Sequence, residues 1–63
     1  MPLVEIKLGQ GVKEDIKEKL IVEVTNAISG VIGCPKEAVH MVIHEIPKTN
    51  WATGGEQHSK KFK

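Results

Sequence analysis

The sequence predicts a small α+β fold in which one long helix connects two parallel strands. Three observations predict this fold. Residues 3–8 alternate with the period of a strand, residues 13–32 repeat apolar side chains at helical spacing, and residues 38–46 return to a strand composition. Such an arrangement forms a right-handed β-α-β unit with parallel strands. We expect residues 1–63 to make a single domain.

The two faces of the first strand differ in character. Val4, Ile6 and Leu8 form an apolar face, while Leu3 shares the opposite face with charged residues. Gly-Gln-Gly at 9–11 then breaks the strand.

The helix that follows has one apolar stripe and clear end signals. Glu14 and Asp15 suit the positive end of the helix, Gly33 suits a left-handed end, and Pro35 prevents continuation. Val22 is apolar on the polar side, where a partner could cover it. The stripe consists of Ile16, Leu20, Ile21, Val24, Ala27, Ile28, Val31 and Ile32.

The second strand carries apolar residues on both faces, and a hairpin follows it. Val39, Met41 and Ile43 share one face, and Val42 lies between histidines on the other. The Gly-Gly pair in TGGE is typical of a tight hairpin turn. We expect residues 57–63 to be a short strand or a mobile tail.

A chain of 63 residues is marginal as an isolated domain, so it needs another source of stability. Cys34 is the only cysteine, which excludes a disulfide within the chain. One helix covers only one face of a two-stranded sheet, and Leu3, Val42 and Ile46 remain on the other face. Exposed apolar faces and open sheet edges favour pairing, so we expect a homo-oligomer.

Charge and hydropathy exclude several function classes. The net charge of +1 gives no footprint for nucleic acid, and the basic HSKKFK segment is typical of a solvated terminus. No apolar run reaches the roughly 20 residues that a membrane helix needs, and no signal-peptide pattern is visible. We therefore expect a cytoplasmic location. His40 and His44 share a strand face but have no third ligand, so we expect no metal site.

Pro2 has two interpretations. A proline at the start of a strand is tolerated because it need not donate a ladder hydrogen bond. If Met1 is removed, however, Pro2 presents a free secondary amine at the end of a rigid element, where it could act as a base.

Several segments together resemble the 4-oxalocrotonate tautomerase family. They are the proline after Met1, the helix stretch EKLIVEVTNAIS, the segment CPKEAVHMVIHEI and the GGE hairpin, and the likeness runs from Pro2 to about Glu56. The resemblance implies the β-α-β tautomerase fold and a hexamer built as a trimer of dimers. It also implies cleavage of Met1, Pro2 as the catalytic base, enol–keto tautomerisation of small 2-hydroxydienoate-like acids, and no metal or organic cofactor.

The chain departs from the family pattern at the two arginines that bind the substrate carboxylates. All nine basic residues are lysines, and the arginine positions correspond to Val12 and His40. His40 could donate one hydrogen bond and Lys13 could supply a point charge, so both are candidate substrate-binding residues. Trp51 stands where the family has a phenylalanine, and the resemblance implies that it forms an apolar wall of a pocket between subunits, although Trp51 could instead simply pack a subunit interface. We therefore expect an altered or relaxed substrate preference, for example for an enol with a single carboxylate.

Two other interpretations remain open. The chain could be a non-catalytic oligomeric module that kept the fold and lost the chemistry, which the missing arginines favour. A nucleic-acid binder has little support beyond the lysine-rich end of the sequence.

Overall fold

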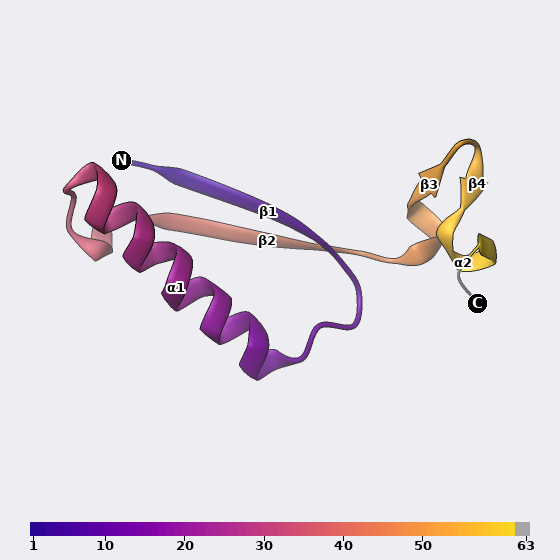
Figure 1. Ribbon diagram of the computed structural model, residues 1–63, viewed down its shortest axis with the longest axis horizontal. Helices are drawn as coiled ribbons and strands as arrows, with labels where there is room; N and C mark the ends of the chain where they lie inside the picture. The colour runs from indigo at the N-terminus through magenta and orange to yellow at the C-terminus, as the bar shows by residue number, and fades with distance from the viewer. Residues whose placement is uncertain (62–63) are drawn as a thin grey trace.

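The computed structural model describes residues 1–61 and confirms the predicted α+β arrangement (Figure 1). The predicted and observed boundaries of the first strand and the long helix agree to within one residue. The elements are β1 (Leu3–Gly9), α1 (Glu14–Ile32), the 3₁₀ turn η1 (Lys36–Ala38), β2 (His40–Ile46), the 3₁₀ turn η2 (Lys48–Asn50), β3 (Ala52–Thr53), β4 (Glu56–Gln57) and α2 (His58–Lys61).

The parallel pairing of β1 with β2 organises the chain. The register runs from Leu3 opposite His40 to Gly9 opposite Ile46. The backbone N–H of His40 donates to the carbonyl of Pro2 at 3.0 Å, which ties the first residues of the chain to β2. Figure 1 shows α1 along one side of this two-stranded sheet. The crossover is therefore the predicted β-α-β unit.

The two sheet faces are as different as the alternation predicted. Val4, Ile6 and Leu8 are half-buried, whereas Leu3 is 64% exposed and Val42 is 45% exposed. One helix cannot cover both faces of the sheet. The face that bears Leu3 and Val42 thus meets solvent in the single chain.

The start of the second strand differs from the expectation. We predicted a strand from residue 38, but Ala38 belongs to η1 and β2 begins at His40. Pro35 holds an extended conformation with φ −64°, and its carbonyl accepts the N–H of Ala38 at 3.0 Å. This turn redirects the chain from the end of α1 into the sheet.

The end of the chain also differs from the expectation of a short strand or irregular tail. Gln57 lies in β4, and His58–Lys61 form the short helix α2. The backbone N–H of His58 donates to the carbonyl of Trp51 at 2.8 Å, which turns this segment back onto the hairpin. Whether residues 57–61 are mobile stays a prediction, and residues 62–63 lie outside the described part of the chain.

The single chain is too extended to enclose a core. It measures 43 × 23 × 14 Å with a radius of gyration of 15.0 Å. A compact domain of this length would have a radius of gyration of about 11 Å. Within residues 1–61 no side chain is fully buried. The surface of 4846 Å² also exceeds the roughly 4,000 Å² expected for a folded monomer of this mass.

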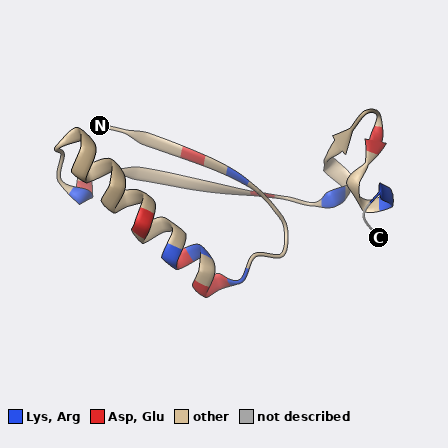
Figure 2. Cartoon of the chain, viewed as in Figure 1, with Lys and Arg blue, Asp and Glu red and all other residues tan. Residues whose placement is uncertain are grey.

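The charged residues are unevenly distributed along α1. Figure 2 shows them in the first half of the helix, and the second half carries none. Val31 and Ile32, at the end of that uncharged half, are 87% and 62% exposed. The apolar surface that the chain fails to bury therefore includes the end of α1 as well as one face of the sheet. No helix in residues 1–61 is long and apolar enough to span a membrane.

Gly33 and Gly30 make a matched pair of stability predictions. Gly33 ends α1 with φ 82°, where an L side chain is strained, although a Cβ would meet no neighbour within 4 Å. We expect Gly33→Ala to lower the free energy of unfolding by about 1 kcal/mol. Gly30 lies inside the helix with equal space around it, so Gly30→Ala should raise that free energy by about 0.5–1 kcal/mol. Urea denaturation of both variants measures the two changes in the free energy of unfolding. If both variants changed it in the same direction, the position assigned to the end of α1 would be wrong.

Candidate functional site

Pro2 lies at the head of β1, immediately before the first paired residue. It is half-buried, and its carbonyl oxygen accepts the His40 N–H at 3.0 Å. The residue before it, Met1, is 92% exposed. The strand pairing therefore fixes the position of the Pro2 ring without relying on any contact of Met1.

His40 is the first residue of β2 and lies beside Pro2 because the register pairs it with Leu3. Its side chain is exposed and alternates onto the same face as Val42 and His44. That face is the one α1 leaves uncovered. The structure thus brings two of the predicted site residues, Pro2 and His40, to one end of the sheet.

Trp51 lies at the opposite end of the sheet from Pro2. Its indole Cζ3 atom is 3.6 Å from the position that a Cβ on Gly9 would occupy, and Gly9 is the last residue of β1. A strand rises about 3.3 Å per residue, so roughly 23 Å of β1 separates Pro2 from Gly9. One chain cannot place its own Trp51 beside its own Pro2.

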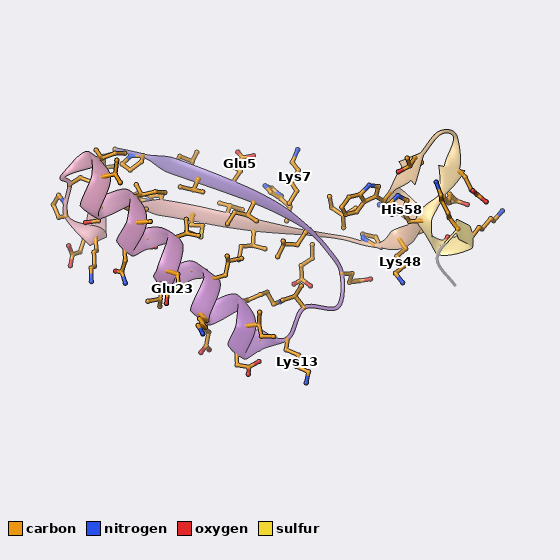
Figure 3. The ribbon with its side chains drawn as sticks, in the orientation of Figure 1. Glu5, Lys7, Lys13, Glu23, Lys48 and His58 are labelled. Carbon is orange, nitrogen blue, oxygen red and sulfur yellow. The ribbon has the colours of Figure 1, made fainter. Side chains whose placement is uncertain are left out.

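Lys13 belongs to the same distant end. It precedes α1 as the N-cap residue, and its carbonyl accepts the N–H of Lys17 at 3.0 Å. Figure 3 shows the Lys13 side chain pointing away from the sheet at the start of the helix. Val12, at the other arginine position of the resemblance, is its half-buried neighbour. The structure thus brings Pro2 and His40 together at one end of the sheet, whereas Trp51 and Lys13 lie separately beyond the other end of β1.

Lys17 is a cation one helical turn after Lys13, and it is already paired. Its ammonium group bonds Glu45 of β2, which links the first turn of α1 to the sheet. The hydrogen bond to Glu45 raises the pKa of Lys17 above its ordinary value of 10.5. This charge serves the packing of α1 on the sheet.

His44 and Glu5 form a longer contact on the uncovered face. His44 Nε2 lies 3.7 Å from a Glu5 carboxylate oxygen, and both side chains are about half exposed. In residues 1–61, no three His, Cys, Asp or Glu side chains gather closely enough to hold a metal ion. The described part of a single chain encloses no pocket either.

The sequence interpretation missed two residues beside Trp51. His58 stacks on the indole with ring centroids 5.1 Å apart and planes at 16°, and Gly9 gives the indole room. The hairpin register could have revealed His58. A Gly-Gly turn pairs Thr53 with Glu56 and Ala52 with Gln57, and the same register continues outward to Trp51 opposite His58.

Comparisons with known proteins agree with this architecture. A family model for tautomerase enzymes matches residues 2–61. A "Probable tautomerase" of Streptococcus thermophilus is 40% identical over 60 residues, covering 95% of this chain and 98% of that protein. Another from Staphylococcus epidermidis is 39% identical over 59 residues, covering 94% of this chain and 97% of the relative. The chain belongs to the tautomerase family.

Solved structures support the same conclusion. One of them comes from work on the 4-oxalocrotonate tautomerase isozymes of Methylibium petroleiphilum. It matches with a TM-score of 0.89 and 37% sequence identity, and the match covers 98% of this chain and 100% of that chain. A heterohexameric 4-oxalocrotonate tautomerase from Chloroflexus aurantiacus has a TM-score of 0.87 and 27% identity, covering 95% and 97%. The resemblance recognised in the sequence is thereby confirmed, and family membership supports a tautomerase or isomerase activity.

Proposed function

We propose that this chain catalyses enol–keto tautomerisation of a small enol acid, with the Pro2 amine as general base after Met1 is removed. The observation that carries the proposal is the position of Pro2, which β-pairing to His40 fixes at the edge of the sheet face that α1 leaves uncovered. A base held by a rigid element needs little further ordering to meet its substrate.

The chemistry follows from the properties of a secondary amine. A general base works best when its pKa lies near the ambient pH, and an α-amine has a pKa of about 8 or above. Apolar surroundings lower that pKa because they disfavour the ammonium form. The amine would take a proton from the 2-hydroxyl group and return one to a carbon of the conjugated system, which is C3 for phenylenolpyruvate and the remote C5 for a 2-hydroxydienoate. His40 would donate a hydrogen bond to the anion formed in between.

A complete site would combine two copies of the chain. Pro2 and His40 of one copy would meet Trp51 and Lys13 of a neighbour, because one chain holds Trp51 and Lys13 beyond the end of β1 that lies opposite Pro2. The extended shape of the chain and its exposed apolar side chains, among them Leu3, Val31 and Val42, support such pairing. The Chloroflexus aurantiacus relative is a heterohexamer, and we propose a homohexamer built as a trimer of dimers for this chain.

The substrate would be a monocarboxylate rather than a dicarboxylate. Arginine offers a permanently charged fork to a carboxylate, and Val12 offers no charge at that position. Lys13 supplies a single ammonium group, and Trp51 supplies a flat apolar surface. An enol such as phenylenolpyruvate fits these groups better than 2-hydroxymuconate does.

Pro2→Ala tests the assignment of the base. The variant keeps an N-terminal amine but loses the rigid secondary amine, so ketonisation of phenylenolpyruvate should fall roughly 100-fold or more. Intact mass should show loss of Met1 in the wild-type protein, and size-exclusion chromatography should show an unchanged assembly. A rate that hardly moves would remove Pro2 from the mechanism.

Co-refolding of Pro2→Ala with Trp51→Ala tests whether the site is shared between copies. Each variant alone lacks one half of the site. In mixed assemblies, an intact Pro2 from one chain can face an intact Trp51 from another, so the rate should rise well above the average of the separate variants. The unmixed variants, refolded in parallel, are the control. A mixture that merely averages the two would show that the two residues do not work across an interface.

A non-catalytic oligomeric module is the second candidate. The absence of arginine favours it, since both carboxylate-binding positions of the family pattern have lost that side chain. Retention of Met1 in the purified protein would support it, because an amide nitrogen at Pro2 cannot act as a base.

A further inference from the structure

The indole of Trp51 lies beside Gly9, the last residue of β1. Gly9 is not among the glycines with positive φ, which are Gly11, Gly33, Gly54 and Gly55. Its backbone would therefore accept other residues. A Cβ at Gly9 would lie 3.6 Å from the indole Cζ3, which is an ordinary van der Waals contact, so an alanine would fit there. A bulky side chain at position 9 would have to share the space beside the indole.

His58 fixes the indole from the hairpin. Trp51 and His58 continue the antiparallel register of β3 and β4, and the His58 N–H bonds the Trp51 carbonyl at 2.8 Å. The two rings stack at 5.1 Å and 16°. Thr53 Oγ1 lies 2.7 Å from His58 Nε2 and sets the rotation of the imidazole. Three contacts thus orient one pair of rings.

A further hydrogen bond anchors the strand that carries His58. The amide of Gln57 donates to the carbonyl of Thr49 at 2.9 Å, which joins β4 to η2, just before Trp51. Figure 3 shows His58 among the side chains of this C-terminal unit, with Lys48 of η2 close by. Trp51 is therefore held on its own hairpin and against the end of β1 at once.

We propose that Gly9 and His58 are positioning residues that hold Trp51 in one orientation and thereby select substrates with a flat apolar substituent. This inference rests on the proposed function, in which Trp51 forms the wall of the neighbouring copy's site. A wall held in one orientation keeps its full stacking surface toward a planar group, whereas a rotating indole does not. A dicarboxylate lacks the planar aryl group and gains little from that surface.

His58→Ala and His58→Phe separate positioning from stability. Trp51 is the only tryptophan and the chain has no tyrosine, so the near-ultraviolet circular dichroism reports the Trp51 environment. We expect His58→Ala to lose most of that signal. The ratio of kcat/KM for phenylenolpyruvate to that for 2-hydroxymuconate should fall about two- to tenfold, the range of one aromatic pair. His58→Phe keeps a stacking ring and should restore both readouts.

Two further variants complete the test. Gly9→Leu should displace the indole from the β1 side and lower the same ratio, even if His58→Ala fails to assemble. Lys60→Ala, in the same short helix as His58, is the matched control, and size-exclusion chromatography checks the assembly of every variant. The proposal is overturned if His58→Ala and Gly9→Leu leave the dichroism and the ratio unchanged, or if the dichroism changes and the ratio does not. Wild-type protein that turns over neither substrate would overturn the proposed function, while the dichroism would still decide whether His58 orients Trp51.

Discussion

The parallel pairing of β1 with β2 is the constraint on which the rest of the structure depends. Its register places His40 opposite Leu3 and lets the His40 N–H bond the Pro2 carbonyl. The same register carries Gly9, and Trp51 with it, to the far end of the sheet. This pattern of hydrogen bonds therefore fixes the position of Pro2, the proposed base, and keeps it away from Trp51 of the same chain. Under the proposed mechanism, the β1–β2 register both positions Pro2 and makes a second copy necessary to bring Trp51 to it.

The energetics point the same way. A single helix over two strands leaves Leu3, Val42 and the end of α1 in water, and no side chain of residues 1–61 is fully buried. Apolar surface gains about 25 cal/mol for each Å² removed from water, so association is the available source of stability. A protein with one cysteine has no internal disulfide to substitute for that burial. In the proposed assembly, the contact that stabilises the fold would also complete the site.

The sequence predicts what depends on local periodicity. Alternation at residues 3–8 and the apolar stripe of α1 predicted the β-α-β unit and its faces, and Gly33 ends the helix as expected. The helix at the C-terminal end was not predicted, because a lysine-rich stretch has the composition of a solvated tail. Its position depends on the pairing of His58 with Trp51 across the hairpin, which local composition does not reveal. The resemblance implied roles for Pro2 and Trp51 in a pocket between subunits, and the missing arginines suggested His40 and Lys13. The register of the sheet adds that Pro2 and His40 lie together in one chain, at the end of β1 opposite Trp51.

A dilution series that follows mass and activity together tests the central claim, that one chain cannot form a working site. Analytical ultracentrifugation would give the mass of the particle, and ketonisation of phenylenolpyruvate at the same concentrations would give its activity per chain. We predict that activity and ordered structure disappear together when the assembly dissociates. A dissociated monomer that stays folded and keeps its full activity per chain would contradict the account.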